Sequence, residues 1–223
     1  MKIAILTPIR TGEVHHAFAS SLARTIQKVR DWELAWFTCI GNSILPDARA
    51  ELVAQALEWG ADKIVFIDDD ISWSVEDFRF LCIHPVTICT GVYMIRPNSL
   101  ENWADKKLCV KVLTDKKTDK HGLVEVGGAG FGFIRIDAKV FADVDVGPLQ
   151  LNGDSPLNDY IRDWFAYRTR EDNTRVGEDF SFCMAARDAG HPVWMDPNIR
   201  LGHHAGALCF EVPSSITNHS DED

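Results

Sequence analysis

The sequence predicts an α/β fold in which helices flank a mostly parallel, mixed central sheet. The main observation is the segment 63–70, Lys-Ile-Val-Phe-Ile-Asp-Asp-Asp. Its four consecutive apolar residues, Ile64–Ile67, are typical of a strand that is buried on both faces between layers of helices. Short apolar strands and helical segments follow one another on both sides of it. Ligands of open α/β sheets bind beyond the carboxyl ends of such strands, so the three acids are a candidate ligand site.

The first strand is expected at Lys2–Leu6, a short apolar run. The segment after it contains Thr7, Pro8 and Arg10, and Gly12 ends it. A hydroxyl and a positive charge at the end of a strand could contact a nucleotide base or phosphate. A plain β-to-α loop is the alternative.

A helix is expected next, running to about Val29, because its apolar residues have helical spacing. These residues are Phe18, Leu22, Ile26 and Val29. His15 and His16 open this helix and face different directions on it, which makes them a poor chelating pair. We expect both on the surface.

A second strand is expected at Leu34–Ile40 and a helix at about Ala48–Trp59, with Gly60 well placed to end it. Arg49 would lie in the first turn of this helix, where the helix dipole disfavours a cation. This placement suggests a partner from outside the helix, such as a phosphate or a carboxylate. The alternative is that Arg49 points into solvent.

The acids Asp68, Asp69 and Asp70 must leave the interior, because no core accepts three adjacent carboxylates. If the backbone stays extended, Asp68 and Asp70 point to one face and Asp69 to the other. Two carboxylates with this spacing can hold a divalent cation and a sugar hydroxyl together. A solvated acidic turn is the alternative.

A short helix is expected at Val75–Cys82, because Ser74 and Asp77 form a variant of the capping box. A strand is expected at Val86–Tyr93. The lysine-rich stretch 101–121 predicts a solvated loop or a weak hairpin.

A glycine-rich segment lies within residues 123–136, where Gly128, Ala129 and Gly130 would let a ligand approach the backbone closely. A sugar ring could lie on this backbone, and a tight turn or bulge is the alternative. The glycines do not have the spacing of the dinucleotide-binding fingerprint, and a strand rather than a helix follows them.

A short helix is expected at Ala138–Phe141, followed by a polar segment at 143–174 with a helical stretch near Leu157–Ala166. Three aromatic residues of this segment could line an acceptor groove, although core packing is the commoner role. They are Trp164, Phe165 and Tyr167.

A strong helix is expected from Gly177 to Gly190, with Glu178 and Asp179 in its first turn. The helix dipole alone explains these acids. The same dipole would keep Asp179 ionised and therefore able to accept a proton.

The C-terminal part predicts a strand at Pro192–Met195, a turn at 196–198 and a continuation at Ile199–Leu201. The sequence Gly202-His203-His204 follows. The polar, acidic tail from Ser214 is expected to fray.

The composition limits the partners. A chain of 223 residues with 46% hydrophobic residues makes one large domain or two small ones with a real core. The net charge of −10 argues against a nucleic-acid backbone or an anionic membrane surface as the main partner. A nucleotide is still possible, because a bound metal can reverse the local charge.

The cysteines and the hydropathy pattern suggest the compartment. No two of the six cysteines have the two-residue gap of a zinc knuckle or redox motif, which favours buried free thiols in a reducing compartment. We find neither a cleavable signal nor an apolar run of about 18 residues, the length that spans a bilayer. A soluble cytoplasmic protein without a transmembrane segment is expected.

The order of these parts resembles the glycosyltransferases of the GT-A fold, and among them the family 2-like enzymes. The matching parts are a first strand ending in Thr7-Pro8, a helix with Ala48-Arg49, the acids after the central strand, the glycine-rich segment, Gly177-Glu178-Asp179 and Gly202-His203-His204. The resemblance covers about residues 1–206. Asp-x-Asp alone is a weak motif, and the order of the parts is more specific.

The resemblance implies a single Rossmann-like domain at 1–210, with a nucleotide-sugar half at about 1–100, an acceptor half at about 101–210 and an acidic tail at 211–223. It implies transfer of a sugar from a nucleoside-diphosphate sugar, with UDP as the expected nucleotide, to a glycan or other hydroxyl acceptor. Mn²⁺ or Mg²⁺ would be the cofactor, held by Asp70 and His203, with His204 as second choice. Asp179 would be the base of an inverting reaction. The implied donor-binding residues are Thr7, Pro8, Arg10, Arg49, Asp68, Asp69, Gly128, Ala129, Gly130 and Glu178.

Three other function classes are open. A haloacid-type phosphatase also uses Asp-x-Asp at a strand end, followed by a hydroxyl residue such as Ser72, although its acids normally follow the first strand. A sugar nucleotidyltransferase should carry a glycine-rich phosphate loop after the first strand, where this chain has one glycine. A non-catalytic sugar-binding module would bind a glycan without a metal.

Overall fold

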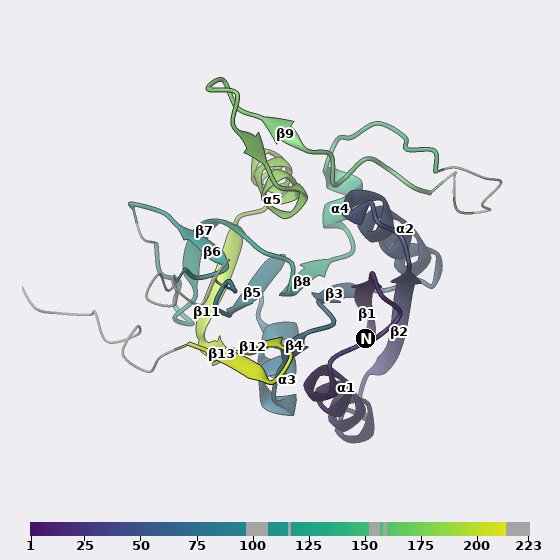
Figure 1. Cartoon of the computed structure of the whole chain (residues 1–223). Coiled ribbons are helices and arrows are strands. Elements are labelled where there is room, and N and C mark those ends of the chain that lie inside the picture. Colours follow the sequence, from purple (N-terminus) through teal and green to yellow (C-terminus); the bar gives the residue numbers. More distant parts are fainter. Residues whose placement is uncertain (97–106, 116, 152–156, 158–159, 213–223) are drawn as a thin grey trace, which may run out of the picture.

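The computed structural model describes residues 1–96, 107–115, 117–151, 157 and 160–212, which form three sheets and five helices (Figure 1). The largest sheet has eight strands. In spatial order they are β2 (Glu33–Ile40), β1 (Lys2–Ile9), β3 (Lys63–Ile67), β8 (Phe133–Asp137), β5 (Ile88–Val92), β11 (Val193–Arg200), β7 (Val124–Ala129) and β6 (Val110–Val112).

The direction of the strands confirms the predicted fold class. Strands β2 and β3 run parallel to β1, and β11 runs parallel to β5. Only β8 and β7 run antiparallel to their neighbours in this sheet, so its other strands all point the same way. The chain is therefore an α/β protein with a mostly parallel, mixed sheet.

Helices cover both faces of this sheet (Figure 1). Helices α2 (Leu45–Glu58), α4 (Val140–Asp143) and α5 (Glu178–Asp188) lie on one side, and α1 (His16–Lys28) and α3 (Val75–Ile83) lie on the other. All four apolar residues of β3, Ile64–Ile67, are fully buried, as predicted for a strand between two helical layers.

A small sheet of β13 (Leu208–Glu211), β12 (Gly202–Ala205) and β4 (Ile71–Ser72) lies beside α1 and α3. Because β12 pairs with β4, residues near 203 are brought next to the end of β3, although they are more than a hundred positions away in sequence. A two-stranded sheet of β9 (Arg168–Thr169) and β10 (Arg175–Val176) precedes α5.

Two element boundaries differ from the sequence predictions in ways that affect the site. Strand β1 extends to Ile9, so Thr7 lies within the strand rather than in a loop. Helix α2 begins at Leu45 with Pro46 in its first turn, a favourable position because proline lacks the N–H group that is unpaired there. Arg49 is therefore in the second turn, not in the first turn as predicted, so the dipole at the start of the helix does not explain its position.

Two further expectations are wrong. The described residues of the stretch 157–166 form turns and an isolated bridge between Pro148 and Arg162, not a helix. Trp164 and Phe165 are buried in the core, the commoner of the two roles considered for them, and Tyr167 is half exposed. Trp164 also borders two smaller cavities. Strand β11 passes through 196–198 with a register irregularity, where a turn was expected.

The remaining expectations concern the cysteines, the lysine-rich stretch and the C-terminal tail. Five of the six cysteines are buried and none is in a disulfide, as expected, but Cys209 is exposed. The lysine-rich stretch contributes β6, which pairs with β7, so the hairpin alternative fits its described part. Residues 101–106 and the tail from Ser214 lie outside the described residues. No helix of the described chain is long and apolar enough to cross a bilayer.

Candidate functional site

A cavity of about 400 Å³ opens beside the carboxyl ends of β1 and β3, the edge at which α/β sheets bind ligands. Eight separate parts of the described chain line it. They are the end of β1 with Pro8 and Arg10, the start of α2 with Leu45 and Arg49, the turn Asp68–Asp70, the segment after β5 with Tyr93 and Arg96, Cys109, Gly130, the start of α5 with Asp179, and His203 of β12. His203 of β12 closes the cavity beside Asp70.

The three acids form a turn rather than an extended segment. The N–H group of Ile71 donates to the carbonyl oxygen of Asp68 at 3.2 Å, which bends the chain between β3 and β4. The alternation predicted for an extended backbone is therefore wrong, and Asp68, Asp69 and Asp70 all line the cavity. Burial and the two neighbouring carboxylates raise the pKa of Asp69 to about 6.

Asp70 and His203 face each other across the cavity wall and form a carboxylate–imidazole pair. His203 Nδ1 lies 2.7 Å from the carbonyl oxygen of Met94, which can only accept, so Nδ1 carries a proton. The other ring nitrogen, Nε2, faces Asp70 Oδ1 at 3.5 Å. In the neutral imidazole Nε2 would present a lone pair to the carboxylate, and either a proton on Nε2 or a bound cation removes this repulsion.

The pKa of Asp70 reflects this environment. Burial alone would raise it, but the hydrogen bond and charge of His203, together with the charge of Arg96, hold it below its usual value. These contacts favour the ionised form of Asp70, which is the form that can bind a cation.

Asp70 and His203 could hold a divalent cation. Carboxylate and imidazole are ligands of Mn²⁺, and a carbonyl oxygen that fixes the second ring nitrogen is typical of metal-binding histidines. Among the described residues, no group of three His, Cys, Asp or Glu side chains forms a complete metal site. Two protein ligands suit a cation that takes further oxygens from substrate phosphates and water.

His204 points away from this pair. Its Nε2 lies 2.8 Å from Ser72 Oγ, and its ring stacks on that of His15 with 4.4 Å between the centroids. His15 Nε2 in turn lies 2.9 Å from the carbonyl oxygen of Gly206. His15 is partly exposed and makes these contacts at the surface, and His16 is exposed, so both lie at the surface as expected.

Arg49 is 3% exposed and lies over the ring of Phe131, 5.0 Å from its centroid. Its two terminal nitrogens face the carboxylates of Asp68, at 3.6 Å, and Glu178, at 3.4 Å. Both separations are long, and Nε and NH1 have no hydrogen-bond partner within the described chain. The partner of Arg49 is therefore a carboxylate, one of the two classes predicted, but these pairings leave hydrogen bonds unmade.

A second buried arginine shows the usual arrangement. Arg135 on β8 is fully buried and donates to the carbonyl oxygens of Leu81 and His84 and to the Asp137 carboxylate. Buried polar groups are normally satisfied in this way. The contrast suggests that the hydrogen-bond set around Arg49 is completed by a ligand.

Asp179 lies in the first turn of α5 and faces the cavity next to Gly130. Burial raises its pKa to about 6, and the neighbouring Glu178 adds to this, although Arg49 opposes it. The expectation that the helix dipole dominates here was wrong. The carboxylate is still ionised at neutral pH, and a pKa near neutrality improves its ability to accept a proton.

Gly130 is the glycine of its segment that borders the cavity. A side chain at this position would place its Cβ 2.5 Å from the Tyr93 hydroxyl. The neighbouring positions are different: Gly128 packs under Phe180, and Ala129 is fully buried. Neither lines the cavity, so the prediction that all three line a sugar pocket is not supported for Gly128 and Ala129.

Thr7 is also outside the cavity lining. It is fully buried, and its hydroxyl accepts a hydrogen bond of 3.1 Å from Trp36 Nε1. The alternation of side chains along a strand explains this, because β1 includes Thr7 and Pro8, and they face opposite sides. Pro8 and Arg10 line the cavity.

Sequence reasoning missed Tyr93 and Arg96, which both line the cavity. The Tyr93 hydroxyl accepts from the N–H group of Gly132 at 3.0 Å, and its ring meets the His203 ring edge-on. Burial raises the pKa of Tyr93 well above its usual value, so the hydroxyl stays protonated. The strand predicted at Val86–Tyr93 ends here, so the strand-end rule applied to the acids would have identified Tyr93.

No protein-family model and no curated protein sequence matches this chain. Among solved structures, it is similar to a chain described as "Crystal structure of a glycosyltransferase involved in the glycosylation of the major capsid of PBCV-1". The two are 10% identical, with a TM-score of 0.36, and the alignment covers 64% of this chain and 62% of that one. This chain therefore spans less than two thirds of the length of that glycosyltransferase.

Proposed function

We propose that this protein is a metal-dependent glycosyltransferase that moves a sugar from a nucleoside-diphosphate sugar to an acceptor hydroxyl. The observation that carries the proposal is one cavity that contains both the Asp70–His203 pair and the carboxylate of Asp179. The first can hold a cation for a diphosphate, and the second can accept a proton. The order of sequence motifs that resembles the GT-A glycosyltransferases supports the same conclusion.

The donor would bind at the end of the cavity formed by the acidic turn. Asp70 and His203 would hold Mn²⁺ or Mg²⁺, which when bound neutralises the charge that develops on the departing diphosphate. Arg10 and Pro8 border the same space at the end of β1, where the nucleotide would lie. UDP is the nucleotide we test first.

Arg49 and Asp68 line the same cavity, and both would contact the donor. A ligand hydroxyl or phosphate oxygen near Arg49 would supply the hydrogen bonds that its guanidinium lacks within the described chain. Glu178 holds the other side of the same guanidinium, so it would act by keeping Arg49 in place.

Asp179 would act as the general base of an inverting reaction. Its carboxylate removes the proton of the acceptor hydroxyl as that oxygen forms a bond to the anomeric carbon, and the bond from this carbon to the diphosphate breaks. Gly130, with no side chain, leaves space beside this carboxylate.

The proposal is tested by nucleotide binding to the full chain. We expect UDP to raise the melting temperature in the presence of Mn²⁺ and to have little effect when EDTA removes the metal. GDP, ADP and CDP are measured in parallel, followed by hydrolysis of the corresponding nucleotide-sugars. A protein that binds glycans without metal and ignores all four nucleotides would instead be a sugar-binding module. Labelling of Asp68 by a phosphate donor would indicate a phosphatase.

The pH dependence follows from the raised pKa of Asp179. Below about pH 6 its carboxyl is protonated and cannot accept a proton, so we expect kcat/KM for sugar transfer to fall as the pH decreases through this value. The sign for stability is the opposite. Because the folded-state pKa is raised, the stabilising contribution of this group is complete below its unfolded pKa and is lost as pH rises through about 6. A rate profile that is flat between pH 5 and 8, within about twofold, would exclude this base.

A further inference from the structure

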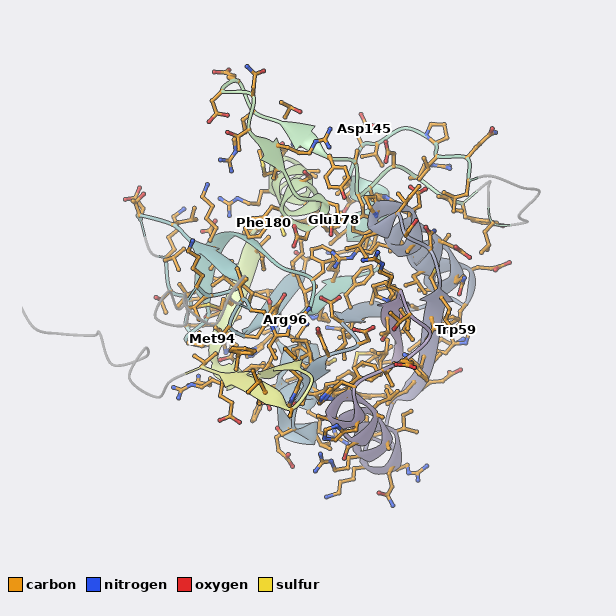
Figure 2. All side chains as sticks on the ribbon, viewed as in Figure 1. Trp59, Met94, Arg96, Asp145, Glu178 and Phe180 are labelled. Atoms are coloured by element: carbon orange, nitrogen blue, oxygen red, sulfur yellow. The ribbon has the colours of Figure 1, made fainter. Side chains whose placement is uncertain are left out.

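Arg96 contacts the same carboxylate as His203, from the other side. Its guanidinium NH2 lies 3.0 Å from Asp70 Oδ2, while His203 faces Oδ1. A second nitrogen, NH1, lies 3.4 Å from the carbonyl oxygen of His204. Figure 2 labels Arg96 next to Met94, beside the small sheet, with Glu178 and Phe180 at the start of α5. Both oxygens of Asp70 therefore already face a nitrogen of the protein.

The two partners of this ion pair differ in exposure. The side chain of Arg96 is 47% exposed, whereas that of Asp70 is 17% exposed. An exposed arginine that pairs with one carboxylate and has one long contact of 3.4 Å to a carbonyl oxygen is held weakly and can exchange its partner at little cost. Asp70 is fixed in the turn, so Arg96 is the member of the pair that can move.

The diphosphate of a bound donor would give Arg96 an alternative partner to Asp70. Four carboxylates and three guanidinium groups line the cavity, and Arg49 is already placed between Asp68 and Glu178. A nucleoside diphosphate carries its negative charge on phosphate oxygens, which arginine binds in a forked, bidentate geometry. Arg10 and Arg96 are the other two arginines of this lining, and Arg96 is the one that contacts Asp70 within the described chain.

We propose that Arg96 makes the binding of the divalent cation and of the donor diphosphate cooperative. Without a donor, its guanidinium stays on Asp70 and repels a divalent cation there, because like charges at such short range oppose each other. With a donor present, it pairs with the diphosphate, and Asp70 is released to the cation. This inference rests on the proposed function for its diphosphate partner, but the competition at Asp70 does not need a nucleotide.

Coupling of this kind is reciprocal. If the diphosphate removes the charge that opposes the cation, the cation must strengthen diphosphate binding by the same factor. Removing the Arg96 guanidinium should therefore have two opposite effects: tighter binding of the cation alone, and weaker binding of the nucleotide in the presence of the cation.

The experiment measures Mn²⁺ and UDP binding to the full chain by calorimetry for wild type, Arg96→Ala and Arg96→Lys. We expect Arg96→Ala to bind Mn²⁺ alone about fivefold more tightly than wild type. We expect it to bind UDP in the presence of Mn²⁺ about tenfold more weakly, because most of the coupling between the cation and the diphosphate is lost. Arg96→Lys keeps the charge without the fork, so it should resemble wild type for Mn²⁺ and lie between the two for UDP. Circular dichroism confirms that each variant is folded.

Arg79→Ala is the matched control, because Arg79 also forms an exposed ion pair with one carboxylate, Asp31, and does not line the cavity. It should leave both affinities unchanged. If Arg96→Ala binds Mn²⁺ as wild type does, or leaves the effect of Mn²⁺ on UDP unchanged, the inference is overturned while the proposed function stands. If wild type binds none of the four nucleoside diphosphates in Mn²⁺, the proposed function fails, and with it the coupling, while the Mn²⁺ titration still reports the competition at Asp70.

Discussion

Asp179→Asn is expected to reduce the rate of sugar transfer by about 10²–10⁴-fold, the usual contribution of a general base. The amide has the shape of the carboxylate but cannot accept the proton of the acceptor hydroxyl. Donor binding in Mn²⁺ should change by less than about threefold, because no group of the cation pair is altered. Single-turnover kinetics with the nucleotide-sugar, together with a binding titration, separate the two effects.

A structural explanation for such a loss can be tested directly. Ionised Asp179 is buried, so replacing it with a neutral amide should leave the protein at least as stable at neutral pH. Asp188→Asn is the control on the same helix, because Asp188 is exposed and pairs with Arg168 away from the cavity. Transfer by Asp179→Asn at more than about a tenth of the wild-type rate would remove Asp179 from the mechanism.

Asp70→Asn is expected to abolish the effect of Mn²⁺ on nucleotide binding, with a loss of at least about 100-fold in affinity for the cation. Even indirect partners of metal ligands cost about 10–100-fold when changed, and Asp70 would be a direct ligand. His203→Gln should cause a loss of similar size, because it removes the imidazole nitrogen that faces Asp70 Oδ1. Calorimetry with Mn²⁺ alone, and with UDP and Mn²⁺, measures both variants.

The neighbouring histidine supplies the matched control for this prediction. His204 is on the same strand but contacts Ser72 and His15 instead of Asp70. His204→Gln should therefore keep the affinity for Mn²⁺ within about twofold, as expected for a residue outside the metal site. A loss in His204→Gln with none in His203→Gln would show that the wrong histidine has been assigned.

The local pattern of the sequence was enough for most of the elements. The apolar run Ile64–Ile67 predicted a fully buried strand, and the capping residues Ser74 and Asp77 predicted the start of α3, where the capping box forms. These features depend on residues a few positions apart, which is the range over which burial periodicity and helix caps act. The helix predicted near Leu157–Ala166 does not form in the described residues of this stretch. Trp164 and Phe165, which suggested it, pack into the core from a backbone that is not helical.

The candidate site was predicted in part for the same reason. Strand ends and helix starts can be found locally, so Pro8, Arg10, Asp68, Asp69, Asp70 and Asp179 were named from sequence, and all of them line the cavity. Local patterns could not predict which individual residues of a strand face the cavity. Thr7 faces the interior because β1 is longer than predicted, and Gly128 packs under Phe180 while Gly130 borders the cavity.

By itself, the sequence determined the α/β class, the order of the main helices and strands in the first half of the chain, and the acidic end of the central strand. Only the tertiary structure decided which histidine faces Asp70, that Arg96 shares this carboxylate, and that the partners of Arg49 are Asp68 and Glu178. The physical reason is distance along the chain. Periodicity and capping act between near neighbours, whereas the pairing of β12 with β4 and the ion pair between Arg49 of α2 and Glu178 of α5 join residues that only the folded chain brings into contact.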